Sequence, residues 1–232
     1  TIAEAIATVE DMLSGNKFGD AGHRVVIEGF LSGEEASFIA MVDGKNVLPM
    51  ATSQDHKARD NGDLGPNTGG MGAYSPAPVV TEEVYQRIMD QVILPTVEGM
   101  AADGNDYTGF LYAGLMVSPD GSINVVEFNC RFGDPEAQPI MLRLKSDLVS
   151  LCLAAINQTL DSEQAEWDSR SAVGVVLASG GYPDSYNKGD AISGLGCERD
   201  DSQKVFHAGT AESDGQIVSN GGRVLCATAL GN

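Results

Sequence analysis

The segment at residues 122–138 constrains this chain most, because polar side chains follow directly on an apolar run. Residues 123–126, apolar except for Asn124, predict a buried strand. Side chains alternate along a strand, so Glu127, Asn129 and Arg131 are expected on one side of it. A carboxylate, an amide oxygen and a guanidinium would then share one surface.

These three groups are suited to binding ATP with a divalent metal. Hard oxygen ligands suit Mg²⁺, which fills its remaining positions with phosphate oxygens, and the fork of arginine donors suits a phosphoryl group. The alternative interpretation of the pattern is an exposed strand end with a surface ion pair.

The next residues resemble a known family. Residues 131–138, Arg-Phe-Gly-Asp-Pro-Glu-Ala-Gln, match the signature of phosphoribosylamine–glycine ligases (glycinamide ribonucleotide synthetases) position by position. The pattern of Glu127, Asn129 and Arg131 is similar to the metal and phosphate motif of the wider ATP-grasp superfamily. This resemblance extends over the whole chain, without the family's N-terminal domain and last helix. It implies an α+β protein: the C-terminal portion of an ATP-grasp fold, followed by a small β-rich C-terminal domain.

Composition limits the partners. The net charge of −19, from 33 acidic and 14 basic residues, argues against nucleic acid and against anionic membranes. No apolar run has membrane-spanning length, and no targeting motif is found, so a cytoplasmic protein is expected. The four cysteines have no metal-binding spacing and are expected to be free thiols: Cys130, Cys152, Cys197 and Cys226.

Local patterns predict the order of the elements. Helices are expected at residues 1–13, from 81 with a restart at Pro95, and at 139–155, where Arg143 and Lys145 are expected to be solvated. The glycine-rich residues 62–75 predict irregular structure. The expected strands are 23–31, 37–42, 46–50, 107–117, 123–128, 172–178, 190–192, 204–208, 215–218 and 223–228. The predicted domains are 1–30, a remnant of the small ATP-grasp subdomain, 31–165, the large subdomain, and 166–232, an incomplete β-rich domain.

The resemblance implies a nucleotide site. Residues 28–31 look like the superfamily's adenine hinge, Glu35 would meet the ribose, and Lys57 would approach the phosphates. The family usually has a second Glu where this chain has Gly29, which would act through its main chain. The implied nucleotide ligands are Glu28, Gly29, Phe30, Leu31, Glu35 and Lys57, and the implied metal ligands are Glu127 and Asn129. The residues alone leave two alternatives open: residues 33–35 could form an ordinary hairpin turn, and residues 55–60 could form a charged loop that faces solvent.

The glycine-rich loop is similar to the family's substrate loop. Its backbone N–H groups can surround an anion. The alternative is a flexible linker, but Pro66, Asn67 and Met71 are unlike the Gly and Ser composition of such a linker. Gly114 stands where other ATP-grasp proteins often have an acidic metal ligand. The glycine ligases also lack an acid at this position, so Gly114 fits the resemblance to them. The implied substrate-binding residues are Asp55, Asn67, Thr68, Gly69, Gly70, Asp134 and Pro135, and the implied catalytic residues are Arg131 and Lys57.

The resemblance implies a reaction in purine synthesis: ATP, glycine and 5-phosphoribosylamine give glycinamide ribonucleotide, ADP and phosphate, with Mg²⁺ or Mn²⁺. A monomer is favoured. Because the chain starts in a helix without an initiator Met, we expect a piece of a longer polypeptide that is inactive alone. The alternatives are another ATP-grasp carboxylate–amine ligase and a nucleotide-binding module without catalysis. His23 fits a solvated strand end, and His207 is not favoured as a catalytic base.

Overall fold

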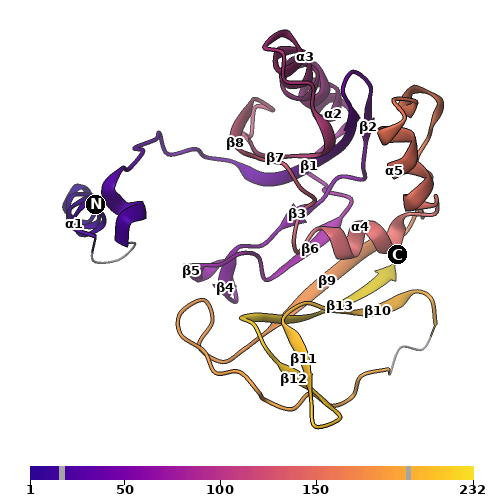
Figure 1. Ribbon diagram of the computed structural model, residues 1–232. Helices are drawn as coiled ribbons and strands as arrows, with labels where there is room; N and C mark the ends of the chain where they lie inside the picture. Colours follow the sequence, from indigo (N-terminus) through magenta and orange to yellow (C-terminus); the bar gives the residue numbers. More distant parts are fainter. Residues whose placement is uncertain (16–18, 197–199) are drawn as a thin grey trace. The chain divides into compact units, whose positions relative to one another are not determined.

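The computed structural model describes residues 1–15, 19–196 and 200–232, which form two compact units, Thr1–Leu31 and Ser32–Asn232. Figure 1 follows the chain through each unit by colour. In the described ranges, no helix is long and apolar enough to cross a membrane. Cys130, Cys152 and Cys226 are free thiols, as predicted, and Cys197 lies outside the described residues.

The first unit begins with helix α1, Ile2–Leu13, which confirms the helix predicted there. Thr1 caps it, because its hydroxyl accepts from the Glu4 N–H at 3.3 Å and the Glu4 carboxylate accepts from Thr1 in return. The short 3₁₀ helix η1, Gly19–His23, follows. The strand predicted at 23–31 is wrong. A strand needs a hydrogen-bonded neighbour, and this segment has none among the described residues.

The second unit contains a four-stranded antiparallel sheet in the order β2-β1-β7-β8. Its strands are β1, Glu34–Asp43; β2, Val47–Pro49; β7, Thr108–Val117; and β8, Ile123–Asn129. The predicted hairpin is confirmed, since Val42 pairs with Val47 and the Asp43 carboxylate accepts from the Asn46 N–H at 2.7 Å. The predicted antiparallel pairing of the two later strands is also confirmed.

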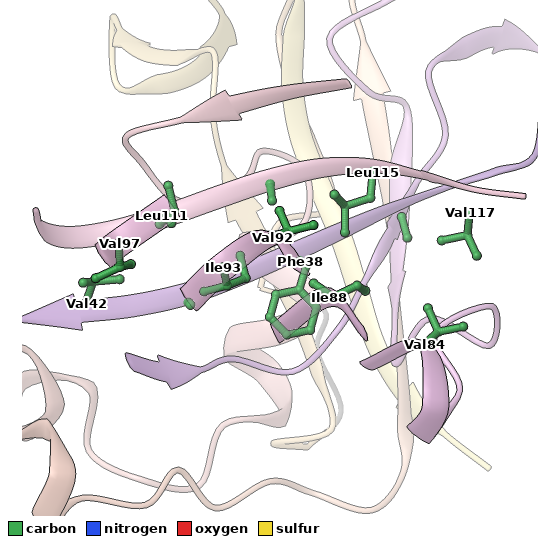
Figure 2. Close-up of a cluster of buried hydrophobic side chains, with 13 residues drawn as sticks. Phe38, Val42, Val84, Ile88, Val92, Ile93, Val97, Leu111, Leu115 and Val117 are labelled. Carbon is green, nitrogen blue, oxygen red and sulfur yellow. The ribbon is translucent and has the colours of Figure 1, made fainter. Parts of the chain in front are cut away.

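Three consecutive helical segments cover one face of this sheet: α2, Glu82–Ile88; the π-helical η2, Met89–Ile93; and α3, Leu94–Ala102. Thr81 caps α2, and Pro95 lies in the first turn of α3, as the predicted restart requires. Figure 2 shows the core between them, where alternate side chains of β1 and β7 pack against the helices. Its largest fully buried members are Phe38, Ile88, Ile93 and Leu115.

Two further helices cover the opposite face: α4, Ala137–Arg143, and α5, Leu148–Ile156, followed by the 3₁₀ turn η3, Leu160–Ser162. The prediction of one helix over 139–155 is wrong. Leu144 leaves the helix to bridge with Trp167, and the Asp147 carboxylate then accepts from the Ser150 N–H at 2.8 Å, which starts α5.

Arg143 is buried, with 8% of its surface exposed, so its predicted solvation is wrong. Its guanidinium donates to Ser75 Oγ at 2.8 Å, to the Arg170 carbonyl at 2.9 Å and to the Asp168 carbonyl at 3.1 Å. These acceptors come from distant segments, which the sequence around Arg143 does not reveal. The neighbouring Lys145 is exposed, as predicted.

A second, five-stranded antiparallel sheet has the order β10-β13-β9-β6-β3. Its strands are β3, Gln54–Asp55; β6, Gly72–Ser75; β9, Ser171–Ala178; β10, Gln203–His207; and β13, Arg223–Gly231. Two hairpins complete the unit: β4, Ala58–Asp60, with β5, Leu64–Asn67, and β11, Thr210–Ser213, with β12, Gln216–Ser219.

Most of the late strands are confirmed, with three differences. Residues 190–192 contribute only a single bridge from Ala191 to Val218, β11 was not predicted, and the 62–75 segment contains β5 and β6 instead of being irregular throughout. The glycines there allow close strand contact: a Cβ on Gly72 would lie 2.5 Å from the Gly174 carbonyl oxygen. β6 pairs with β9, so one sheet contains residues from both sides of the predicted domain boundary after residue 165. The predicted division into domains stays a prediction.

The burial predicted for residues 123–126 is wrong. In β8, Val125 is 40% and Val126 is 42% exposed. A run of apolar residues indicates burial on both faces, but β8 is the edge strand of its sheet and the helices of this unit pack mainly over β1 and β7.

Candidate active site

Two neighbouring pockets in the second unit share Asp55 and Lys57. The smaller has a volume of about 180 Å³ and is lined by Asp55, Lys57, Thr68, Gly69, Tyr112, Glu127, Arg131, Asp134 and Glu136. The larger has a volume of about 430 Å³ and is lined by Gly33, Glu34, Glu35, Gln54, Asp55, His56, Lys57, Ala58, Asp63, Asn67 and Met116. Most of the residues predicted for the site in this unit line one pocket or the other.

Strand β8 brings Glu127 to the smaller pocket. Its pairing with β7 shifts between Gly114 and Leu115, so Val126 is an extra residue, and beyond this bulge Glu127 pairs with Gly114. A Cβ on Gly114 would lie 3.3 Å from Glu127 Cγ, so the absence of a side chain there leaves room for the carboxylate. Gly114 therefore contributes space to this site instead of an acidic ligand.

Asn129 and Arg131 follow Glu127 at alternate positions. Asn129 Nδ2 is buried and has no hydrogen-bond partner in the described part of the chain. Arg131 lines the smaller pocket, with its Cζ 6.0 Å from the centre of the Tyr112 ring and its Nη1 donating to the Phe132 carbonyl at 2.9 Å. Glu127 and Arg131 are thus brought together at one pocket, whereas Asn129 is not among the residues that line it.

Lys57 connects the two pockets. Its ammonium forms an ion pair with the carboxylate of Glu35, on β1, and both side chains are mostly buried, with 27% and 28% of their surfaces exposed. Burial lowers the pKa of Lys57. The hydrogen bond to Glu35 and the negative charges of Glu35, Asp55 and Glu127 raise it by more than burial lowers it, so the pKa of Lys57 is above its usual value. Lys57 is therefore a fixed positive charge beside both pockets.

Asp55 is a carboxyl group with a perturbed pKa. Burial raises its pKa to about 7, the charges of Glu136 and Glu35 act in the same direction, and Lys57 and Arg223 oppose them. Asp55 Oδ1 is buried and has no hydrogen-bond partner within the described ranges. The Asp55 carboxyl group, as part of the lining of both pockets, can accept a hydrogen bond from an ammonium group of a substrate.

Three hydrogen-bonded polar residues at the smaller pocket were not predicted from the sequence: Tyr112 and Glu136, which line it, and Ser37. The Glu136 carboxylate is 2% exposed and accepts from Ser37 Oγ at 2.7 Å, and the same hydroxyl lies 3.0 Å from Tyr112 Oη. Burial, followed by the charge of Glu136, raises the pKa of Tyr112. Gly133 is required beside this network, because a Cβ there would lie 2.5 Å from Glu136 Oε2. The only sequence signal for these residues was Glu136 within the 131–138 signature.

The glycine-rich loop is attached to the Lys57 segment through Thr68. The Thr68 N–H and hydroxyl donate to the Lys57 carbonyl at 2.7 and 2.9 Å, and the Gly70 N–H donates to Thr68 Oγ1 at 3.0 Å. Thr68 and Gly69 line the smaller pocket, Gly70 is buried beside it, and Asn67 lines the larger pocket. The loop residues predicted for substrate binding are therefore divided between the two pockets.

The signature loop, residues 131–138, lies against the glycine-rich loop, residues 62–75. A Cβ on Gly70 would lie 2.3 Å from Pro135 Cδ, and the carboxylate of Asp134 forms an ion pair with Arg223 Nη2 at 3.1 Å. Arg223, at the start of β13, was missed by the sequence analysis. Neither its spacing nor its neighbours Gly221 and Gly222 indicated a site.

The predicted adenine-binding residues belong to the other unit. Residues 28–31 have no regular secondary structure, and the Phe30 side chain is 96% exposed. Their assignment stays a prediction: Glu28, Gly29, Phe30 and Leu31.

Comparison with known proteins decides the family. The model of the phosphoribosylglycinamide synthetase ATP-grasp (A) domain matches residues 1–137, and that of the phosphoribosylglycinamide synthetase C domain matches residues 172–232. The chain belongs to the phosphoribosylglycinamide synthetase family. This confirms the family resemblance and the predicted fold class, the C-terminal portion of an ATP-grasp fold followed by a β-rich region.

Named relatives agree with this family. The chain is 68% identical to phosphoribosylamine–glycine ligase of Vibrio parahaemolyticus over 232 residues and 67% identical to that of Escherichia coli over 233 residues. The comparison covers 100% of this chain and 54% of each relative, so the chain spans about half the length of the curated relatives it matches.

Solved structures also resemble this member of the synthetase family. Phosphoribosylamine–glycine ligase of Thermotoga maritima matches 100% of this chain and 56% of its own, with a TM-score of 0.84 and 35% identity. A biotin carboxylase domain of the Hydrogenobacter thermophilus 2-oxoglutarate carboxylase matches 99% of this chain and 48% of its own, with a TM-score of 0.66. At 16% identity, this second match shows the shared fold alone.

Proposed function

We propose that this chain acts in the ATP-dependent ligation of glycine to 5-phosphoribosylamine, which gives glycinamide ribonucleotide, ADP and phosphate in purine synthesis. One observation carries the proposal. In a chain of the phosphoribosylglycinamide synthetase family, an acidic metal ligand candidate, two cations and a glycine-rich loop line one pocket of about 180 Å³. Its curated relatives are named phosphoribosylamine–glycine ligases, which supports the ligation of these two substrates.

Glu127 and Asn129 fit a divalent metal that also binds the phosphates of ATP. Neither side chain has a hydrogen bond within the described residues, and the Asn129 amide has a buried polar atom without a partner. An amide can present its oxygen to a cation after a half turn. No group of three or more His, Cys, Asp or Glu in the described residues could hold a metal alone, so phosphate oxygens would complete the ligands of Mg²⁺ or Mn²⁺.

A bound metal would neutralise charge on the transferred phosphoryl group. The chain's own cations act on the same charge. Arg131 lines the pocket beside Glu127, and Lys57 lies between the two pockets, so both can bind the γ-phosphate as the carboxylate of glycine attacks phosphorus. The P–O bond to ADP breaks, and glycyl phosphate is formed. We assign Arg131 and Lys57 as the catalytic residues.

Asp55 and the glycine-rich loop would hold glycine. The carboxylate of Asp55, which lines the pocket, can accept from the ammonium of glycine. The loop carrying Asn67, Thr68, Gly69 and Gly70 lies opposite the signature residues Asp134 and Pro135. The amine nitrogen of 5-phosphoribosylamine then attacks the acyl carbon, the C–O bond to phosphate breaks, and phosphate leaves. Positioning and charge stabilisation supply most of the rate enhancement in such transfers.

The larger pocket is the proposed site for the ribose of the nucleotide. Glu35, which lines it, would bind the ribose after exchanging its ion pair with Lys57 for hydroxyl donors. The hinge residues Glu28 to Leu31 would bind adenine. Nucleic acid and membranes are not proposed as partners, and a monomer is proposed.

A hybrid enzyme tests the function. The 232 residues replace the matching residues of the Vibrio parahaemolyticus ligase, and ADP formation is measured with ATP and 5-phosphoribosylamine, with and without glycine. The unmodified Vibrio enzyme is the positive control, and the host strain lacks its own ligase. We expect ADP formation that requires glycine and yields glycinamide ribonucleotide. Glycine-independent ADP formation, or replacement of glycine by other amino acids at equal rates, would contradict the proposal.

A further inference from the structure

Arg223 connects the C-terminal region to both loops of the smaller pocket. Its Nη1 donates to the Gly69 carbonyl at 2.7 Å and to the Asp134 carbonyl at 2.7 Å, and its Nη2 forms an ion pair with Asp134 Oδ2 at 3.1 Å. Only 22% of the Arg223 side chain is exposed. One guanidinium therefore bridges the glycine-rich loop and the signature loop.

Tyr182 makes a second contact from the same region. The Gly69 N–H donates to Tyr182 Oη at 3.0 Å. Both backbone polar groups of Gly69 are thus bound by side chains from residues 172–232, the part that matches the C domain of the family. The fit is close, because a Cβ on Gly69 would lie 3.1 Å from Arg223 Cζ and 3.3 Å from Tyr182 Oη.

These contacts matter because glycine-rich segments have high conformational freedom. A site that orients small substrates needs its backbone groups fixed by surrounding residues. An arginine is suited to this task, since its planar fork reaches two acceptors at once, whereas a lysine offers a single point of charge. The Arg223 charge also acts on Asp55, whose raised pKa it partly lowers.

We infer that Arg223 is a positioning residue for the proposed glycine pocket. It fixes the distance between Gly69 and Asp134, and Tyr182 fixes the direction of the Gly69 N–H. The C-terminal region then forms part of the substrate site. This inference rests on the proposed function. The competing explanation is that the contacts of Arg223 and Tyr182 stabilise the fold without any effect on substrate binding.

Kinetics of the hybrid enzyme separate these explanations. Arg223→Gln removes the charge and the fork, Arg223→Lys keeps the charge, and Tyr182→Phe removes only the acceptor of the Gly69 N–H. The matched control is Arg170→Gln, because the Arg170 guanidinium also binds an aspartate, Asp168 at 2.8 Å, but this partner lies outside the glycine-rich loop and the signature loop.

We expect Arg223→Gln to raise the KM for glycine by about 10-fold or more, with a much smaller change in the KM for ATP. Arg223→Lys should restore part of the difference, and Tyr182→Phe should raise the glycine KM by about 3-fold. Arg170→Gln should leave both constants unchanged. An unchanged glycine KM in Arg223→Gln, with only a lower melting temperature, would overturn the inference.

Hydrogen exchange on the 232-residue chain provides a readout that does not need catalysis. Arg223→Gln should speed amide exchange in peptides covering 66–72 and 131–137, and Arg170→Gln should not. Unaltered exchange in both peptides would overturn the inference even if the hybrid is active. If the hybrid shows no glycine-dependent activity while these peptides exchange faster, the proposed function fails and the loop contact stands.

Discussion

Gly70 and Pro135 lie in direct contact across the candidate site, although they are far apart in sequence. Gly70 has φ of +117°, and a Cβ on it would lie 2.3 Å from Pro135 Cδ. The glycine-rich loop can approach the signature loop only because this residue has no side chain. Gly70 thus has a steric role here as well as a conformational one.

Gly70→Ala should therefore be strongly destabilising. The added methyl group meets a rigid ring, and alanine is strained at this φ, so we expect a loss of about 2 kcal/mol or more in the free energy of unfolding. Gly99→Ala is the control, since Gly99 is in helix α3 with no atom within 4 Å of an added Cβ. It should gain about 0.5–1 kcal/mol. Urea denaturation measures both, and equal stability of the two variants would contradict the account.

Asp55 should make the stability of the chain depend on pH. The pKa of Asp55 is raised from 3.8 to about 7 in the folded chain. Between these values the folded state binds this proton more tightly than the unfolded state, so the contribution to stability is present at low pH and is lost as the pH rises toward 7.

Asp55→Asn removes this dependence. Relative to the parent chain, the variant should gain about 2 kcal/mol more at pH 8 than at pH 5. Urea denaturation without nucleotide or divalent metal measures the difference, and the exposed Asp161→Asn is the control. A difference that is constant with pH would show that Asp55 is not perturbed.

Arg143 should be important for folding. Arg143→Met keeps much of the volume but leaves the carbonyls of Asp168 and Arg170 and the Ser75 hydroxyl without their donor. We expect a loss of about 3 kcal/mol in the free energy of unfolding. Lys145→Met is the control, because Lys145 is 56% exposed and lies 3.9 Å from Asp168. If both substitutions cost the same, the buried contacts of Arg143 carry little stability.

Glu127 and Arg131 should be required for turnover in the hybrid enzyme. Glu127→Gln weakens the proposed metal ligand, and Arg131→Ala removes a cation beside the transferred phosphoryl group. Each should lower kcat by ~10²-fold or more. Glu98→Gln, on the exposed face of α3, serves as the control and should leave kcat unchanged. Near-normal turnover in either site variant would remove the role assigned to that residue.

Features encoded by neighbouring residues were predicted well. Helix α1 carries its own capping residue, the β1–β2 hairpin carries its own turn, and β7 and β8 are joined by a short Pro-Asp-Gly segment. These signals act over a few residues, so a single sequence shows them.

Features set by distant contacts were not predicted. The break between α4 and α5 depends on the bridge from Leu144 to Trp167, and the burial of Arg143 depends on acceptors near residues 75 and 170. The exposure of Val126 follows from the place of β8 at the sheet edge, which an apolar pattern cannot reveal.

The candidate site shows the same division. Glu127, Arg131 and the glycine-rich loop were found because they lie in contiguous motifs. Arg223 and Ser37 were missed because only the folded chain brings them to those motifs. A lone arginine after two glycines carries no local signal of its contact with Gly69.

The most direct test of the central claim is the dependence of ADP formation on glycine in the hybrid enzyme. With ATP and 5-phosphoribosylamine present, we predict that ADP and glycinamide ribonucleotide form in equal amounts, and only when glycine is added. ADP formation at the same rate without glycine would contradict the claim that this pocket activates glycine.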